Sequence, residues 1–241
     1  MPKKNADNLI LFCMTALMIL FVYALSQIFG ICHARFKAEA VTKNLICKAV
    51  SAPRQKDIPI QIDFDILQQN SEHIVGWIYC ENTPIHYPVM QSKDNIFYLN
   101  RLPDGSYNAA GSIFLDYRNA PAFTDKLSIL HGHNLETDSM FGTLLKYQSQ
   151  TYYDEHPELY LLTPSKHYRI SLFAGCVTTA TSPLYTRNDD LFQIICAMTQ
   201  CSDFTASTTP DEQDQIIALS TCTNDHPDTR YVLLGILQAL Q

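Results

Sequence analysis

A continuous apolar stretch near the N-terminus limits what this chain can fold into. Residues 9–31 contain no charged side chain, and about 20 apolar residues are enough to cross the hydrocarbon core of a bilayer as a helix. Lys3 and Lys4 precede the stretch, which favours a cytoplasmic N-terminus. The sequence therefore predicts a single-pass transmembrane anchor at residues 9–31, a cytoplasmic tail at residues 1–8 and an extracytoplasmic remainder.

Two other interpretations of this stretch stay open. The sequence Ala38-Glu39-Ala40 has the form of a signal-peptidase site, so a cleaved signal peptide would also place the remainder outside the cytoplasm. The apolar part of a signal peptide usually has only about 7–15 residues, which is shorter than this stretch. A buried core helix is the second alternative, although no amphipathic pattern marks it.

The remainder of the 241-residue chain is long enough for one domain with a sizeable core. The net charge is −7 and no long basic run is present, which argues against a nucleic-acid partner. None of the eight cysteines form a CxxC motif, so zinc-ribbon and thioredoxin-like interpretations fail. Cys196 and Cys201 are the one close pair, and whether they form a disulfide is left open.

The pattern of apolar residues predicts a mainly β domain at residues 61–241, preceded by a linker or stalk at residues 32–60. A short helix is expected at residues 63–70 with Asp63 as its N-cap, and further helices at residues 139–147 and 189–201. Eight short strand-like segments favour a closed or nearly closed β-barrel over a parallel α/β sheet. These segments are residues 75–79, 85–90, 111–116, 127–131, 158–163, 168–173, 216–222 and 230–237.

The last two strand-like segments hold the most informative residues of the chain. Cys222 ends the first segment, a seven-residue polar loop follows, and Arg230 begins the second. If the two segments pair as a hairpin, Cys222 and Arg230 become cross-strand neighbours, roughly 5 Å apart at Cβ. A thiol at a strand end beside a guanidinium is well placed as a nucleophile, whereas the alternative is a buried structural Cys222 with a surface Arg230.

His131 ends the strand-like segment at residues 127–131, His133 follows it, and Gly132 between them allows a tight exit. A cysteine with a histidine suggests acyl transfer through a thioester, in which an imidazolium donates a proton to the leaving amine. Arg230 would then stabilise the oxyanion or orient the substrate. A zinc site made of His131, His133 and Cys222 is a rival interpretation, but a fourth ligand is not evident.

These residues and the order of several other motifs resemble the class B sortases. The resemblance covers nearly all of the chain after residue 60, together with the N-terminal anchor. The most specific element is Leu219-Ser-Thr-Cys222 followed by Arg230, with an upstream Gly-His pair. Further landmarks are Val75-Gly-Trp-Ile78, Tyr87-Pro-Val-Met-Gln91, Asp94-Asn95 with Tyr98-Leu99, Gly111-Ser-Ile-Phe-Leu-Asp116, Gly132-His-Asn134, Ser139-Met-Phe-Gly142 and His156-Pro157.

The resemblance implies a sortase-like closed eight-stranded β-barrel with an N-terminal helix and a helix inserted before the last strands. It also implies a cysteine transpeptidase in the cell membrane of a Gram-positive bacterium. Such an enzyme cleaves surface proteins after the threonine of a C-terminal sorting motif, holds the product as a thioester and transfers it to an amine of a lipid-linked peptidoglycan precursor. Cys222 would be the nucleophile, His133 the general acid and base, and Arg230 the oxyanion or motif ligand, with no cofactor and no metal.

The resemblance also implies which residues line the substrate site: Asn95, Leu99, Thr181, Tyr185, Thr186 and Ser220. The chain departs from some relatives at the position after the cysteine, where Thr223 stands in place of an acidic residue. The nearest acidic residue is Asp225, so the role of a carboxylate here is open. The length of the loop from Cys222 varies in the family, so the assignment of Arg230 depends on the strand register.

Three other functions remain as alternatives. A related sortase that polymerises pilins would use a lysine amine as its acceptor. A membrane-tethered binding module with an inactive site belongs to another class, but the intact set of His133, Cys222 and Arg230 argues against it. A cysteine peptidase of wall peptides commonly places its cysteine before its histidine, whereas this chain has the reverse order.

Overall fold

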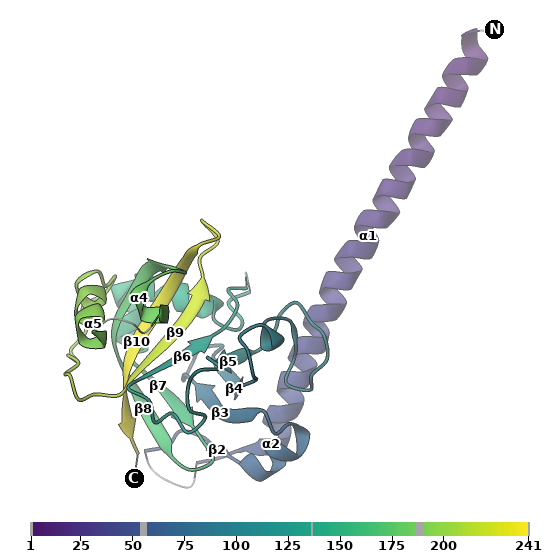
Figure 1. Cartoon of the computed structure of the whole chain (residues 1–241). Coiled ribbons are helices and arrows are strands. Elements are labelled where there is room, and N and C mark those ends of the chain that lie inside the picture. Colours follow the sequence, from purple (N-terminus) through teal and green to yellow (C-terminus); the bar gives the residue numbers. More distant parts are fainter. Residues whose placement is uncertain (1, 54–56, 136, 187–189, 241) are drawn as a thin grey trace. The chain divides into compact units, whose positions relative to one another are not determined.

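The computed structural model of the protein describes residues 2–53, 57–135, 137–186 and 190–240 (Figure 1). The chain divides between Ala40 and Val41 into two compact units. The first unit is the greater part of helix α1 (Pro2–Ala49). Within Ile10–Ala49 the helix is long and apolar enough to cross a membrane by length and composition.

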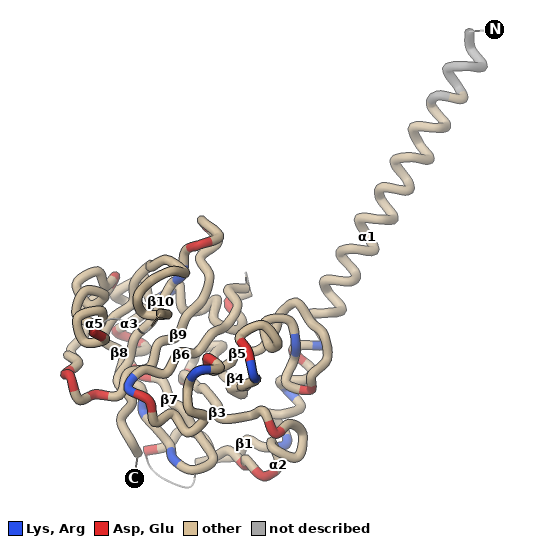
Figure 2. The backbone as a smooth tube through the Cα atoms, viewed as in Figure 1, with Lys and Arg blue, Asp and Glu red and all other residues tan. Residues whose placement is uncertain are grey.

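The large apolar side chains at residues 10–31 of α1 are exposed rather than packed in a core, as Leu11, Leu17 and Phe29 illustrate. Figure 2 shows no basic or acidic residue along the tube at residues 10–31. This exposure argues against the core-helix alternative. The division of the chain into a tail, an anchor, a stalk and a catalytic domain stays a prediction.

The second unit is built on a closed barrel of eight strands in the order β10-β8-β7-β3-β4-β5-β6-β9. The fold class predicted from the sequence is thereby confirmed. Two pairs of neighbouring strands, β4–β5 and β6–β9, are parallel, and all other neighbouring pairs in the barrel are antiparallel. The strands are β3 (Ile74–Tyr79), β4 (His86–Met90), β5 (Ile113–Leu115), β6 (Leu127–His131), β7 (Glu158–Leu162), β8 (His167–Thr179), β9 (Ile216–Cys222) and β10 (Thr229–Ala239).

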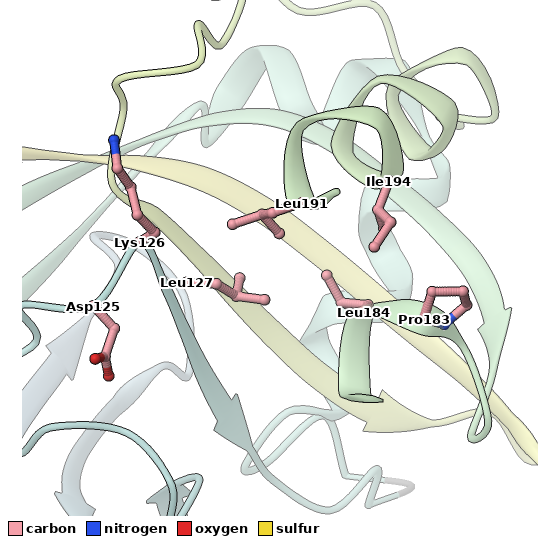
Figure 3. Close-up of a pocket in the computed structure, with 7 residues that line it drawn as sticks. All are labelled: Asp125, Lys126, Leu127, Pro183, Leu184, Leu191 and Ile194. Atoms are coloured by element: carbon pink, nitrogen blue, oxygen red, sulfur yellow. The ribbon is translucent and has the colours of Figure 1, made fainter. Parts of the chain in front are cut away.

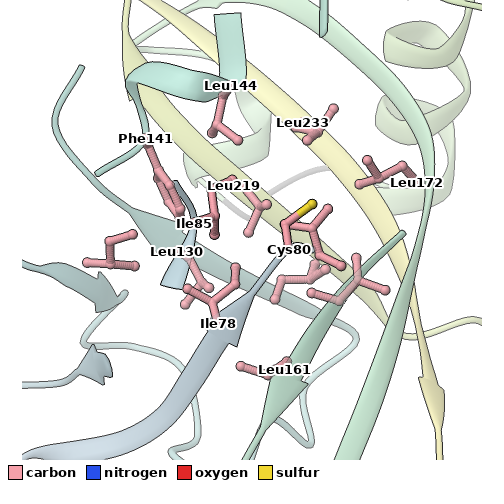
Figure 4. Packing of buried hydrophobic residues seen from close by; sticks show 14 of the residues in the cluster. Ile78, Cys80, Ile85, Leu130, Phe141, Leu144, Leu161, Leu172, Leu219 and Leu233 are labelled. Atoms are coloured by element: carbon pink, nitrogen blue, oxygen red, sulfur yellow. The ribbon is translucent and has the colours of Figure 1, made fainter. Parts of the chain in front are cut away.

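The barrel interior is filled by one apolar cluster to which all eight strands contribute (Figure 4). In β9 these interior residues are Ile217 and Leu219, whereas Ile216 and Ala218 belong to a second cluster outside the barrel. Successive side chains of a strand point to opposite faces. Even-numbered residues of β9 therefore face outward, and this alternation fixes where the strand's functional side chains lie.

One part of the outer surface is covered by α4 (Pro183–Thr186) and α5 (Leu191–Gln200). Leu184, Ile195 and Met198 pack there against outward residues of β6, β8, β9 and β10. Helix α5 is the inserted helix that the sequence predicts at residues 189–201, although residue 189 lies outside the described residues. Asp190 begins the helix by accepting a hydrogen bond from the backbone N–H of Phe192 at 3.0 Å.

A different part of the outer surface is covered by α2 (Phe64–Asn70), the 3-10 helix η1 (Phe97–Asn100) and the C-terminal end of α1. Asp63 caps α2 as predicted, accepting from the N–H of Ile66 at 3.0 Å. Leu45 packs in the same cluster, and β1 (Val50–Ser51) pairs with β2 (Gln61–Ile62). The segment at residues 32–60, predicted as a linker or stalk, is thus helical up to residue 49 and partly buried; its residues 54–56 lie outside the described residues.

The helix predicted at residues 139–147 is wrong in type and bounds. The structure has a 3-10 helix, η2 (Gly142–Gln148), preceded by a turn in which Asp138 and Met140 adopt positive φ. Helix α3 (Gln150–Glu155) follows and was not predicted, because it has no apolar periodicity. It is held in place by Tyr153, whose ring stacks on Phe204 with centroids 4.2 Å apart.

Candidate active site

The predicted register of the last two strands is confirmed. Cys222 of β9 and Arg230 of β10 are directly paired across the antiparallel ladder. A seven-residue loop connects them, and the backbone N–H of Thr223 donates to the carbonyl of Thr229 at 3.1 Å, which extends the pairing one step past Cys222. The register therefore places Cys222 and Arg230 side by side at one end of the hairpin, on the same face of the sheet.

The strand that leads to His133 ends beside Cys222. Strand β6 runs parallel to β9, and its last residue, His131, pairs with Ser220. The pairing continues through Gly132, whose N–H donates to the Ser220 carbonyl at 3.1 Å and whose carbonyl accepts from the Thr221 hydroxyl at 2.8 Å. His133 thus leaves β6 at the level at which β9 reaches Cys222.

Cys222, Ser220 and Arg230 lie on the outer face of the barrel rather than inside it. Strand alternation gives this result, because Leu219 of β9 and Tyr231 of β10 belong to the interior cluster. Cys222 and Arg230 are both half-buried. A thiol in the filled interior would be closed to a peptide, whereas the outer position leaves Cys222 accessible.

His133 is fixed by a contact with η1. Its Nε2 lies 2.7 Å from the carbonyl oxygen of Leu99, which can only accept, so Nε2 carries a proton and Nδ1 is left for exchange with a substrate. Gly111 makes this approach possible. It has a φ of +60°, and a Cβ there would lie 2.5 Å from the Leu99 oxygen and 3.0 Å from the His133 ring.

Packing leaves no room for a side chain at Gly132, the glycine at which the chain leaves β6. A Cβ at this position would lie 2.7 Å from the ring of Phe141, which is fully buried in the interior cluster. The N–H of Phe141 in turn donates to the His133 carbonyl at 3.0 Å. Phe141 therefore fixes the backbone around His133 in two ways: its ring packs against Gly132, and its N–H binds the His133 carbonyl.

Arg230 is oriented by its own loop. One guanidinium nitrogen, Nη1, donates to the carbonyls of Pro227 at 2.8 Å and Thr229 at 2.9 Å. The loop is closed by a hydrogen bond between the hydroxyls of Thr223 and Thr229. Thr223 is buried, whereas Asp225 is exposed at the loop tip. Thr223 therefore closes the base of the loop that follows Cys222.

Tyr185 of α4 joins the outer face next to these residues. Its hydroxyl lies 2.7 Å from the Ser220 hydroxyl, and its ring stacks on His131 with centroids 6.3 Å apart. Burial raises the pKa of Tyr185 to about 12, with a further rise from Cys222, although the hydrogen bond to Ser220 and the charge of Arg230 act in the opposite direction. Tyr185 is therefore a neutral hydrogen-bonding group within the electrostatic reach of Cys222 and Arg230.

Asp116 is the residue that sequence reasoning missed. It follows β5, is fully buried, and accepts from Arg118 Nε and Nη2 at 2.8 Å, from Asn95 Nδ2 at 2.9 Å and from His131 Nε2 at 3.3 Å. Burial alone would raise the pKa of Asp116, but the hydrogen bonds from Arg118, His131 and Asn95 outweigh it and hold the pKa well below its usual range. The sequence signal that could have identified Asp116 is an acidic residue at a strand end, two positions before an arginine.

The remaining predicted substrate residues fall into two groups. Asn95 and Leu99 lie on the η1 side, where Asn95 contacts Asp116 and Leu99 contacts His133. Thr181 and Thr186 are exposed, and their hydroxyls bond within their own segment, to Thr179 at 3.2 Å and to the carbonyl of Pro183 at 3.2 Å. The structure thus gathers Asn95, Leu99, Tyr185 and Ser220 around the outer face and leaves the two threonines at its margin.

The zinc alternative does not fit this geometry. The Nε2 atom of His131 is directed to Asp116 and that of His133 to the Leu99 carbonyl. Across the described residues, no group of three or more His, Cys, Asp or Glu side chains is arranged to hold a metal ion. The eight cysteines, including Cys196 and Cys201, are free thiols in the structure.

No family model matches the chain. Comparisons with known sequences and with solved structures, in contrast, find sortase B proteins. Sortase B of Listeria monocytogenes is 34% identical over 177 residues, which cover 71% of this chain and 72% of that protein. Sortase B of Staphylococcus aureus is 30% identical over 175 residues, covering 70% and 71%. The crystal structure of Bacillus anthracis sortase B in complex with AAEK1 has a TM-score of 0.73 and 30% identity, covering 87% of this chain and 100% of that one.

Replacing the buried carboxylate is expected to make stability less dependent on acid pH. Because the pKa of Asp116 is depressed in the folded state, its ionised form stabilises the fold above the unfolded-state pKa of about 4. This stabilisation is lost as the pH falls toward the folded-state pKa. Asp116→Asn should therefore lower the free energy of unfolding by about 3 kcal/mol at neutral pH, because Arg118 loses its counter-charge. Urea unfolding followed by the fluorescence of Trp77, the single tryptophan, measures this.

The difference between the wild type and Asp116→Asn should shrink as the pH is lowered below about 4. Glu212→Gln is the matched control, because Glu212 is exposed and its removal should change stability by less than about 0.5 kcal/mol. A difference that stays constant over the whole pH range would contradict the assignment of a charged, stabilising Asp116.

Proposed function

The chain belongs to the sortase B family, and from this premise we propose that it cleaves a C-terminal sorting motif after threonine and transfers the product to a cell-wall amine. At the level of the family it is a sortase, a cysteine transpeptidase. The observation that carries the finer proposal is the pairing of Cys222 with Arg230 on the outer face of the barrel, at the strand end where His133 leaves β6.

Two solved relatives support the classes of substrate. A Staphylococcus aureus sortase B–substrate complex is 25% identical to this chain with a TM-score of 0.71. A crystal structure of sortase B complexed with triglycine has the same identity and TM-score. We infer that this chain likewise takes a peptide as acyl donor and an amine as acyl acceptor.

In the proposed reaction the Cys222 thiolate attacks the carbonyl carbon of the motif threonine. The resulting oxyanion is met by guanidinium donors of Arg230, since the loop carbonyls engage only Nη1 and a guanidinium has five N–H groups. The leaving amine takes the proton on Nδ1 of His133 as the C–N bond breaks, which produces a thioester on Cys222.

The second half of the reaction reverses these roles. Nδ1 of His133 accepts a proton from the incoming amine, the amine nitrogen attacks the thioester carbonyl, and the thiolate of Cys222 leaves. The hydrogen bond from His133 Nε2 to the Leu99 carbonyl keeps the ring in one orientation through both steps.

We also propose that residues 9–31 anchor the enzyme in the membrane and that the catalytic domain lies outside the cytoplasm. The single apolar helix at the N-terminus, with Lys3 and Lys4 before it, supports this topology. The reaction requires it as well, since both the surface protein and the wall amine are met outside the cell.

The central test uses the full-length chain in detergent micelles with a panel of sorting-motif peptides, read by mass spectrometry with triglycine or lysine as acceptor. We expect cleavage after threonine, an acyl adduct on Cys222, and loss of both in Cys222→Ala. Cys201→Ala is the matched control, because Cys201 is an exposed thiol at the end of α5. A folded protein that shows neither cleavage nor adduct would favour the inactive-module alternative, and transfer to lysine alone would favour the pilin-polymerising one.

Arg230→Lys is expected to lower kcat by about 100-fold with little change in KM, because a lysine cannot keep the loop contacts and also donate to the oxyanion. Steady-state kinetics on the cleaved peptide measure this. Arg169→Lys is the control, because Arg169 pairs with Glu158 near the start of β8, at the end of the strand that lies away from Arg230. A rise in KM at constant kcat would instead assign Arg230 to binding of the motif.

The topology predicts that a membrane-impermeant maleimide labels Cys201 on intact cells. Cys201 is exposed and belongs to the barrel unit. The adduct would be detected by mass spectrometry of the peptide that contains Cys201, with Cys201→Ser as the blank. Labelling that appears only after the cells are permeabilised would place the domain in the cytoplasm and contradict the proposal.

A further inference from the structure

Asp116 carries a negative charge that the proposed reaction does not use. Its side chain is 1% exposed, whereas that of its partner Arg118 is 35% exposed. Removing a carboxylate from water is costly unless hydrogen bonds and an opposite charge compensate it. Arg118 satisfies it with two side-chain N–H groups and with its own backbone N–H, at 2.8, 2.8 and 3.0 Å. We call Asp116 with Arg118 the clasp.

On one side the clasp holds the segment that precedes η1. Asn95 donates from Nδ2 to Asp116 at 2.9 Å, while its Oδ1 accepts from the backbone N–H of Tyr117 at 2.9 Å. Both ends of the Asn95 amide are therefore engaged by residues that immediately follow β5. Any movement of Asp116 would be passed to Asn95 and, four residues later, to Leu99, whose carbonyl contacts His133.

On the other side the clasp holds α4. The third guanidinium nitrogen of Arg118, Nη1, donates to the backbone carbonyl of Tyr185 at 2.9 Å. The Tyr185 hydroxyl in turn contacts Ser220, two residues before Cys222. Arg118 thus joins the η1 side to the α4 side across the outer face, with His131 between them in contact with both Asp116 and the Tyr185 ring.

Helix α4 needs this tie because its own packing is weak. The helix has four residues, and a helix this short is not stable on its own. Leu184 is its one fully buried side chain, and it lies beside a cavity of about 220 Å³ that is also lined by Leu127, Pro183, Leu191 and Ile194 (Figure 3). Since the cavity leaves part of this wall without packing partners, apolar contacts alone do not fix the position of Tyr185.

We propose that Asp116 and Arg118 are positioning residues that set the spacing between Asn95 and Tyr185 and so shape the binding site for the sorting motif. The inference rests on the proposed function, because it assigns the motif to the face between these two residues. It follows from the geometry of a guanidinium, which satisfies the carboxylate with Nε and Nη2 and still reaches the Tyr185 carbonyl with Nη1. A lysine ammonium, as a single point donor, cannot span both partners.

The test compares Arg118→Lys with the wild type and with Arg169→Lys, all as full-length chains in detergent micelles. Arg169→Lys makes the same chemical change at a half-exposed arginine–carboxylate pair, 3.4 Å from Arg169 Nε to Glu158, on the barrel wall. In Arg118→Lys we expect hydrogen exchange to accelerate together in residues 94–100 and in residues 182–186. We also expect KM for the best motif peptide to rise about tenfold at nearly constant kcat.

Two further readouts separate positioning from general damage. The rate at which iodoacetamide alkylates Cys222 should stay within about twofold of the wild type, since the thiol itself is untouched by the clasp. Arg169→Lys should change neither the exchange of the two segments nor KM. Acceleration in both segments of Arg118→Lys, together with the rise in KM, supports the proposal.

Three results would overturn it. Unchanged exchange in both segments would mean that Arg118 holds neither, and a faster exchange with an unchanged KM would mean that their spacing does not matter for the motif. A fall in kcat with slower alkylation would place the effect at the thiol instead. A wild type that turns over no peptide refutes the proposed function, and in that case the exchange data alone still decide whether the clasp joins the two segments.

Discussion

The parallel pairing of β6 with β9 is the constraint on which the site depends. Because the strands are parallel, their C-terminal ends lie at the same edge of the barrel, so His133 and Cys222 are brought to one level although they are 89 residues apart. Strand β10 then returns antiparallel to β9 and begins at that edge with Arg230. A parallel pair requires a long crossover connection, and here the connection contains β7, β8 and the helices α4 and α5.

The filled interior explains why the candidate site lies on the outer face of the barrel. An eight-stranded barrel is just wide enough for side chains to fill, and every strand contributes an apolar residue to the interior cluster. Side chains at the outward positions are covered by α4 and α5 on one part of the surface and by α2, η1 and the end of α1 on another. The row formed by Phe114, His131 and Ser220, which pair in succession, joins these two covered regions and ends beside Cys222.

Charge is distributed unevenly over this face. The carboxylate of Asp116 is buried among donors from Arg118, Asn95 and His131, whereas the neighbourhood of Cys222 has a guanidinium held by loop carbonyls. A negative charge next to the thiol would oppose formation of the thiolate, and the loop after Cys222 begins with the buried, neutral Thr223. In the proposed function, the carboxylate would hold the walls of the site and the guanidinium would act on the reacting atoms.

The sequence by itself determined the class of fold, the eight strands and the pairing of Cys222 with Arg230. It could do so because strand alternation is local, and because a short hairpin loop fixes which residues face each other. Helix α5 and the capping of α2 by Asp63 were predicted for the same local reasons. The role of Thr223 was visible only as a departure from some relatives.

Only the tertiary structure decided what surrounds those residues. Asp116 meets Arg118 nearby in the sequence, but its contacts with Asn95 and His131 and the reach of Arg118 to Tyr185 join four separate segments. The contact between His133 and the Leu99 carbonyl likewise depends on Gly111, which has a positive φ and lies against both residues, two positions before β5. Periodicity reports which face a residue occupies, whereas contacts between faces depend on how the strands close into a barrel and how the helices cover it.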